Sequence, residues 1–218
     1  DCTDMRGAIP LSDTAMRNNL MKGRLAQFIL SEAGPRVALD MEDYGLDSDT
    51  TRVDDTDYAE FDGIIKQAKT YGAANHTLLS PVSAADVDDQ LFYYLRLALP
   101  KKYWRDLPNM RYYCSPNTEA AYQYYRKSHT ADMGYVYAEQ NMVGRMTFDG
   151  VPLFAVPNMP DDVVILTHRM NIVWAIELGV EWELEREPKK ARYLYHVRYS
   201  FDVKFAVRDA LAIHDNVK

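Results

Sequence analysis

The C-terminal part of the chain alternates apolar and polar residues over an unusual length. Apolar side chains occupy eight successive odd positions, namely Tyr193, Tyr195, Val197, Tyr199, Phe201, Val203, Phe205 and Val207. Successive side chains of a β-strand point to opposite faces of the sheet, so this period of two predicts one strand with an apolar face and a polar face. The strand would be far longer than the roughly 5–6 residues of an ordinary strand.

The segment before this strand continues the pattern. Three apolar residues, Val180, Trp182 and Leu184, alternate with three glutamates, and the sequence PKKA at 188–191 can turn the chain. We therefore expect an antiparallel hairpin over residues 180–208, with the glutamates opposite Arg192, Arg198 and their neighbours. A hairpin of this size with a charged outer face is difficult to stabilise inside one small domain, and it more naturally lies against neighbouring subunits.

Length and composition limit the class of protein. The chain has 218 residues, of which 47% are hydrophobic, so it is long enough for one large domain or two small ones with a real core. No window approaches the ~18 uncharged apolar residues of a transmembrane helix, and no secretory signal is visible. Cys2 and Cys114 form no disulfide framework, which suits a reducing compartment.

The N-terminal third has a helical pattern interrupted by proline. Apolar residues recur at helical spacing from 13 to 33, and Ser12 or Asp13 can cap that helix. Gly34-Pro35 should break or kink it, because proline lacks the N–H and clashes one turn back. A second helical piece is expected over residues 37–44.

Other elements follow from local signals. The sequence first predicts a helix over 58–71 and a helix that begins at Ser83 and Asp86 and ends before Pro100. A strand at 110–114 and a helix that begins at Ser115-Pro116 follow. The last elements are two buried strands at 151–156 and 163–167 and a short helix at 168–178 that ends at Gly179. We find no internal repeat and no low-complexity tract.

Acidic residues are concentrated in one segment. The net charge is −7, and residues 40–62 alone contain ten acids and one base. Asp47-Ser48-Asp49 begins like a calcium-binding EF-hand loop, but Arg52 and Tyr58 stand where that loop needs glycine and glutamate. The segment is therefore interpreted as a solvated loop. The chain has no long basic run, so a general affinity for nucleic acid is not expected.

Signatures of catalysis are missing from the sequence. It has no phosphate-binding P-loop, no strand followed by G-x-G-x-x-G, no G-x-S-x-G and no H-E-x-x-H. Cys114 lies in a strand-like context that favours a buried small side chain over a nucleophile. Tyrosine and arginine interleave in several segments, which is more typical of protein contact surfaces than of base stacking. We predict no enzyme activity, no cofactor, and no catalytic, cofactor-binding or metal-ligating residues.

The C-terminal half resembles a known family. Residues 148–213 are similar to the end of a tailed-phage major capsid protein of the HK97-like fold. Three features support this resemblance: G-x-P-x-x-x-V-P-x-M-P at 150–160, L-T-x-x-x-N-x-V-x-x-I at 166–176, and a charged, aromatic last strand that reaches Asp209-Ala210-Leu211. Upstream, residues 90–127 resemble the family's central helix, strand and Ser-Pro-led helix, and residues 12–45 fit its long spine helix.

The resemblance implies a fold and a division into domains. The expected class is α+β, with a peripheral domain built from the spine helix and the long β-hairpin, and an axial domain built from a small mixed sheet flanked by helices. We expect residues 1–71 in the peripheral domain, residues 72–178 in the axial domain, and residues 179–218 in the hairpin that returns to the peripheral domain. The family also has an N-terminal arm and an extended loop before the spine helix. A chain that opens with Asp1 is expected to be a fragment or a processed product that lacks them; the alternative is that the resemblance is incomplete.

The resemblance also implies a function. It indicates a structural subunit that assembles with its own copies into pentamers and hexamers of an icosahedral phage or prophage head around double-stranded DNA. Scaffold or head protease and portal would be partners during assembly, with no sequence-specific nucleic acid and no membrane. The location would be the virion capsid, and the host cytoplasm during assembly. Two alternatives stay open: an encapsulin-like bacterial nanocompartment shell, and a metal-dependent hydrolase that uses the acidic segment 40–62.

Overall fold

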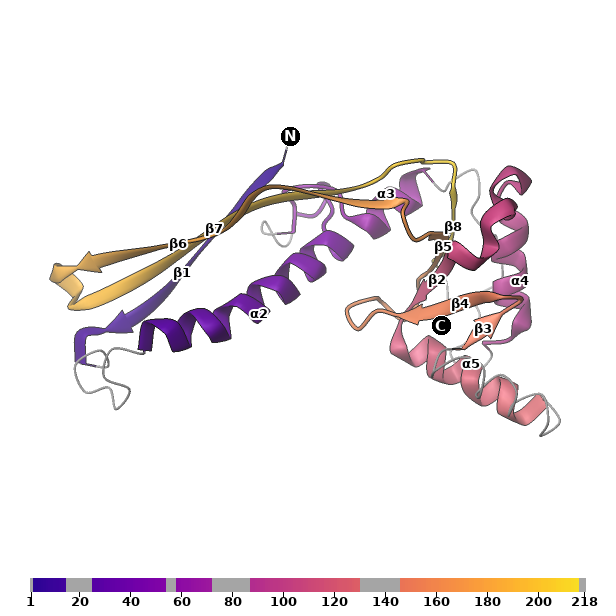
Figure 1. Cartoon of the computed structure of the whole chain (residues 1–218), viewed down its shortest axis with the longest axis horizontal. Helices are drawn as coiled ribbons and strands as arrows, with labels where there is room; N and C mark the ends of the chain where they lie inside the picture. Colours follow the sequence, from indigo (N-terminus) through magenta and orange to yellow (C-terminus); the bar gives the residue numbers. More distant parts are fainter. Residues whose placement is uncertain (1, 15–24, 54–57, 72–86, 130–145, 216–218) are drawn as a thin grey trace. The chain divides into compact units, whose positions relative to one another are not determined.

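The fold is described from a computed structural model, which describes residues 2–14, 25–53, 58–71, 87–129 and 146–215. The chain forms two compact units (Figure 1). Unit 1 contains Asp1–Phe61 and Trp174–Val203, and unit 2 contains Asp62–Val173 and Lys204–Lys218. Each unit is described separately below.

Unit 1 is built on a long three-stranded antiparallel ribbon. Its strands are β1 (Thr3–Ser12), β6 (Ile172–Glu187) and β7 (Arg192–Phe205), in the order β1-β7-β6. The short 3-10 turn η4 (Pro188–Lys190) and Ala191, which has a φ of 47°, join β6 to β7. The predicted hairpin with its turn at PKKA is confirmed, and β6 begins eight residues earlier than the predicted hairpin did, at Ile172 instead of Val180.

Strand β1 completes the ribbon and was not predicted. It pairs with β7 over its whole length, from Thr3 opposite Phe201 to Ser12 opposite Arg192. Gly7 and Pro10 conceal the strand in the sequence, because both residues are uncommon in strand interiors. Proline is tolerated here because β1 lies at the edge of the sheet, where a missing N–H does not interrupt a ladder on both sides.

Helix α2 (Leu25–Asp47) continues through Gly34-Pro35, so of the predicted break or kink the break is wrong. A proline clashes with the Cβ of the residue before it, and Gly34 has none. Open space surrounds the position that a Cβ of Gly34 would occupy. Figure 1 shows α2 beside the ribbon of unit 1. The helix buries Ala33, Val37 and Leu46.

An aromatic cluster forms the core of unit 1. The Phe201 ring stacks on Trp174 with centroids 5.8 Å apart and meets the edge of Phe61 at 5.3 Å. Gly45 of α2 lies against the indole of Trp174, with no room for a Cβ. Glycine at this position therefore lets the helix approach the ribbon closely.

Unit 2 contains a five-stranded mixed sheet in the order β3-β4-β2-β5-β8. The strands are β2 (Met110–Cys114), β3 (Thr147–Phe148), β4 (Val151–Ala155), β5 (Val164–His168) and β8 (Leu211–His214). Only the β2–β4 pair is parallel among these described strands. The helices of the unit are α3 (Ile64–Tyr71), α4 (Asp89–Ala98) and α5 (Pro116–His129), with a 3-10 segment η3 (Lys101–Asn109).

The centre of unit 2 is aromatic and fully buried. Phe92 of α4 makes edge contacts with Tyr112 of β2 at 5.1 Å and with Tyr122 of α5 at 4.6 Å. The Tyr112 hydroxyl donates to the Phe92 carbonyl at 3.1 Å, and the Tyr122 hydroxyl donates to Asp89 at 2.7 Å. One aromatic cluster therefore holds a strand and two helices together.

Several predicted elements of unit 2 are confirmed. Strand β2 matches the predicted residues, Ser115 caps α5 by accepting the Thr118 N–H at 3.1 Å, and α4 ends before Pro100. Asp88 caps α4. The predicted capping pair Ser83 and Asp86 lies outside the described residues.

Two predictions are corrected. Residues 172–178 belong to strand β6 and not to a helix, because pairing with β7 outweighs their local helical pattern. The helix expected over 58–71 is restricted to α3. The two strands predicted at 151–156 and 163–167 are confirmed as β4 and β5, and β2 lies between them in the sheet. In addition, the described residues 204–215 belong to unit 2, where β8 pairs with β5.

Candidate assembly surfaces

Strand β6 carries an uncovered apolar strip. It is an outer strand of the ribbon, and Ile176, Val180 and Leu184 are 61%, 41% and 52% exposed. Their even spacing places them on one face of the strand. An outer strand also presents unpaired backbone groups along its free edge. The apolar strip, defined by these three residues, is therefore a surface suited to contact with another chain.

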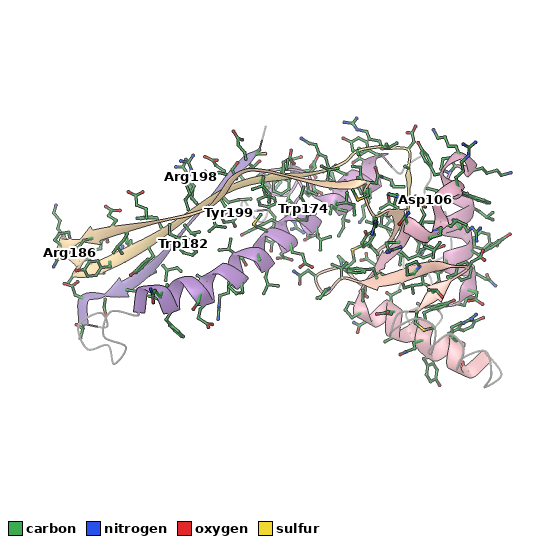
Figure 2. The ribbon with its side chains drawn as sticks, in the orientation of Figure 1. Asp106, Trp174, Trp182, Arg186, Arg198 and Tyr199 are labelled. Carbon is green, nitrogen blue, oxygen red and sulfur yellow. The ribbon has the colours of Figure 1, made fainter. Side chains whose placement is uncertain are left out.

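The polar face of the ribbon carries paired arginines. Arg6 of β1 stands directly opposite Arg198 of β7, and both bind one carboxylate. Arg198 donates to Asp4 at 2.6 Å and Arg6 donates to it at 3.4 Å. The hydrogen bond from Arg198 is the main reason that the pKa of Asp4 is lowered. Figure 2 labels Arg198 on the ribbon, and a groove of about 680 Å³ beside this arginine pair also contains Trp182 and His196.

The tip of the hairpin is crossed by ion pairs. Glu187 accepts from Arg192, which lowers the pKa of Glu187, and lies 3.5 Å from Lys190. Glu185 contacts His196 at 2.9 Å. The predicted pairing of glutamates with basic residues is thus confirmed near the tip. Arg198 is the exception, because its partner is Asp4 of the unpredicted strand β1. The sequence signal for β1 was the set of apolar residues at the odd positions Met5, Ile9 and Leu11.

In unit 2, Asn171 connects two turns by hydrogen bonds. Its side-chain amide nitrogen donates to the Thr167 hydroxyl at 2.9 Å and to the Val207 carbonyl at 3.1 Å. Its side-chain oxygen accepts the Val207 N–H at 2.7 Å, and its backbone carbonyl accepts the Ala206 N–H at 2.8 Å. Asn171 is buried, so these bonds fix the turn after β5 to the turn before β8.

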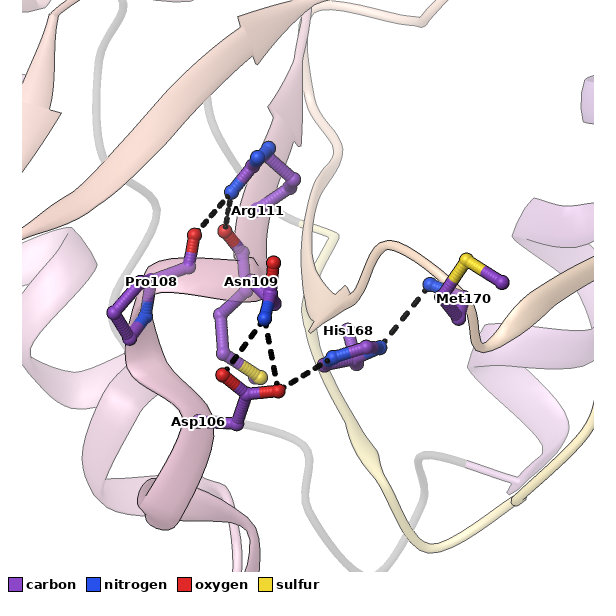
Figure 3. A network of polar contacts seen from close by, with 7 residues as sticks. Asp106, Pro108, Asn109, Arg111, His168 and Met170 are labelled. Carbon is purple, nitrogen blue, oxygen red and sulfur yellow. Dashed lines mark hydrogen bonds and ion pairs between the residues drawn. The ribbon is translucent and has the colours of Figure 1, made fainter.

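A second polar network anchors the same turn to η3 (Figure 3). The Met170 N–H donates to Nδ1 of His168 at 3.1 Å, which assigns the ring proton to Nε2, where it is donated to Asp106 at 3.1 Å. Asn109 donates to both oxygens of Asp106 at 2.8 and 3.0 Å. The bonds from Asn109 and then His168 lower the pKa of Asp106. This geometry explains the histidine as a structural residue.

The acidic segment is partly satisfied by its own residues. Asp43 accepts from the Tyr58 hydroxyl, and Asp47 contacts Arg52 at 3.1 Å. Asp49 accepts both the N–H and the hydroxyl of Thr51. The carboxylates that begin the EF-hand-like sequence are therefore engaged in local contacts. Residues 54–57 lie outside the described residues.

The part of the chain that the structure describes contains no candidate metal cluster, and its Cys114 is buried. No group of three or more His, Cys, Asp or Glu side chains there could hold a metal ion. Cys114 is buried, and burial raises the pKa of its thiol to about 12, so it is not a thiolate at neutral pH. Among the described helices, none is both long and apolar enough to cross a membrane.

A curated relative is a capsid protein. No protein-family model matches the chain. The chain is 25% identical over 210 residues to the putative prophage capsid protein YqbE of Bacillus subtilis (strain 168). The matched region covers 90% of this chain and 64% of that relative, so the chain spans just under two thirds of the relative's length.

Solved structures share the fold over the whole chain. A chain of the satellite phage P4 procapsid including size determination (Sid) protein matches with a TM-score of 0.71 and 14% identity, covering 100% of this chain and 71% of that one. The SrpI encapsulin complex from Synechococcus elongatus PCC 7942 matches with a TM-score of 0.62 and 15% identity, covering 100% and 74%. The chain therefore has the HK97-like α+β fold of tailed-phage major capsid proteins, as its sequence resemblance indicated.

Proposed function

We propose that this chain is the structural subunit of a phage or prophage head, which assembles into pentamers and hexamers of an icosahedral shell around double-stranded DNA. The proposal rests on the capsid relative, the shared fold and the ribbon of unit 1. It assigns the chain a structural role without catalysis.

The observation that carries the proposal is the incomplete burial of the ribbon. None of the 16 residues of β6 is buried, although the strand alternates apolar and polar side chains. An isolated protein that exposes a long apolar edge risks aggregation, whereas a shell subunit covers that edge with its neighbours. The ribbon is therefore a surface that copies of this chain complete.

The two units correspond to the two domains of the family fold in this proposal. Unit 1, with its ribbon and α2, is the peripheral domain, and unit 2, with the mixed sheet, is the axial domain around the five-fold and six-fold axes. Scaffold or a head protease, and a portal, are the expected partners during assembly. Assembly takes place in the host cytoplasm, and the product is the virion capsid.

Electron microscopy of the full gene product tests the proposal. We expect closed shells when the protein is expressed with the scaffold or protease encoded beside it. Shells should disappear when Ile176→Asp and Val180→Asp place charges on the apolar strip, while the circular dichroism spectrum of the monomer stays unchanged. Exclusively monomeric wild-type protein under these conditions would refute the proposal.

An encapsulin-like nanocompartment is the second candidate, because the SrpI encapsulin shares the fold over the whole chain. The two functions differ in what the shell contains. Purified shells with a single co-purifying enzyme and no nucleic acid would favour the nanocompartment. A portal and terminase encoded next to the gene, with DNA-filled particles, would favour the phage head.

A further inference from the structure

Two groups of basic residues in the described part of the chain differ in how far nearby acids neutralise them. At the hairpin tip, Arg186 lies 3.5 Å from Asp13, while Lys190 and Arg192 both contact Glu187. The tip therefore offers little unpaired positive charge to a partner.

The other group lies in unit 2 and is termed the basic rim. It comprises five exposed residues, Lys101, Lys102, Arg105, Arg169 and Arg208. Three contacts bring these distant segments together: Lys102 to Asp209 at 4.0 Å, the Arg169 N–H to the Asn109 carbonyl at 3.0 Å, and His168 to Asp106 at 3.1 Å. Figure 2 labels Asp106 in this region.

The basic rim keeps most of its charge. Among the described residues, Lys101, Arg105, Arg169 and Arg208 form no ion pair, and Arg208 instead covers the Tyr71 ring at 4.2 Å. The rim borders a mainly apolar cleft of about 330 Å³ that includes Met170. An exposed group of cations beside apolar surface is suited to a partner that is acidic and partly apolar.

The same chain carries a surface of opposite sign, the acidic helix end. It is formed by Asp40 and Glu42 in the last part of α2, together with Glu60. Asp40 and Glu60 line one cleft, where Val37 adds an apolar contact, and none of the three acids forms an ion pair among the described residues. The last turn of α2 has no basic residue, so the helix dipole adds to this negative potential.

We propose that the basic rim of one copy binds the acidic helix end of a second copy of this chain. This inference rests on the proposed function and names a contact within the shell. The charges are complementary and, apart from the Lys102–Asp209 pair, form no ion pair among the described residues of one copy, and both surfaces combine charge with a small apolar cleft. Contacts of this kind favour correct partners and penalise juxtaposed like charges.

A nucleic acid fits the rim less well. Asp106 and Asp209 lie within it, and their carboxylates would repel a continuous phosphate backbone. A protein surface with separate carboxylates can avoid these two acids, and the acidic helix end supplies such a surface from the same sequence.

A charge-swap experiment on the full gene product tests the contact. Arg105→Glu with Arg169→Glu reverses the rim, and Asp40→Lys with Glu60→Lys reverses the helix end; all four side chains are exposed, so the monomers should fold normally. Each reversal should weaken self-association, measured by sedimentation at low salt, by about tenfold or more. The combined four-substitution variant should regain association. Lys189→Glu with Lys190→Glu at the hairpin tip is the matched control and should have a smaller effect.

Three outcomes would overturn the proposal. The reversals could leave association unchanged, or the combined variant could fail to regain it. Alternatively, the wild type could bind a 30-base-pair DNA duplex through the rim, with binding lost in the rim reversal and association unaffected. Failure of the proposed function is scored separately, because it is the absence of shells in electron micrographs, whereas this contact is measured as pairwise association in solution.

Discussion

The outer strand β6 of unit 1 and the strands β5 and β8 of unit 2 are covered very differently. None of the 16 residues of β6 is buried, whereas eight of the nine residues of β5 and β8 are. Unit 2 obtains its hydrophobic stabilisation from its own chain. Unit 1 leaves part of its apolar surface for neighbours, so its contacts should affect assembly more than the stability of the monomer.

The largest effect is expected in the core of unit 2. Phe92→Ala should lower the free energy of unfolding by about 3–5 kcal/mol, because it removes a fully buried ring that contacts Tyr112 and Tyr122. Urea denaturation of the monomer measures the change.

Ile176→Ala in β6 is the control for this comparison. Because Ile176 is 61% exposed, the substitution should change monomer stability by less than about 0.5 kcal/mol and should reduce shell yield instead. Similar losses of stability in the two variants would show that the apolar strip is covered within the monomer.

Asn171→Ala should have the second-largest effect. The substitution leaves the Val207 N–H without its protein partner and removes one of two donors to the Val207 carbonyl, which still accepts the Ala210 N–H at 3.1 Å. It should cost about 1–3 kcal/mol. Chemical denaturation and amide hydrogen exchange of the two turns measure it. Asn171→Asp keeps the side-chain oxygen that accepts the Val207 N–H and loses the amide nitrogen that donates to the Val207 carbonyl. The Val207 amide should therefore stay better protected from hydrogen exchange in Asn171→Asp than in Asn171→Ala. Equal protection in the two variants would argue against these hydrogen bonds.

The sequence was most informative where local signals and the fold agree. Strand β2, the Ser115-Pro116 helix start and the turn at 188–191 each depend on residues close together in the chain. The helix predicted at 168–178 was wrong for residues 172–178, because their apolar spacing fits a helix whereas pairing with β7 makes them a strand. Long-range pairing decides such cases and leaves no local trace.

The surfaces proposed for assembly were predicted to different degrees. The alternation of residues 193–207 indicated a ribbon with one polar face, and the structure confirms it. Burial of both Ser200 and Asp202 shows that the polar face is covered at that end of β7. The basic rim could not be predicted, because Arg105, Arg169 and Arg208 come from three separate segments and form no run in the sequence.

Arg198→Glu should separate assembly from folding in unit 1. The Arg198–Asp4 pair is exposed, and exposed ion pairs contribute about 0–1 kcal/mol to the free energy of unfolding. The monomer should therefore lose at most about that much stability, plus a small contribution from repulsion between the new glutamate and Asp4. Shell yield should fall further if the polar face meets neighbours. Arg198→Gln, which removes the charge without reversing it, should lie between the wild type and Arg198→Glu. A full loss of monomer structure would contradict the assignment of this face.

The smallest expected effect is a loss of stability at acidic pH, to which both units should contribute. The pKa values of Asp106 in unit 2 and of Asp4 in unit 1 are lowered by hydrogen bonds from neighbouring side chains. Between the folded pKa and the usual value near 3.8, the unfolded chain binds more protons than the folded one. The stabilisation is therefore complete above that usual value and is lost as the pH falls through the folded pKa. Between pH 5 and 2, the melting temperature of Asp106→Asn should fall slightly less steeply than that of the wild type. Identical pH profiles of the melting temperature would show that the contacts of Asp106 with Asn109 and His168 do not stabilise the folded chain.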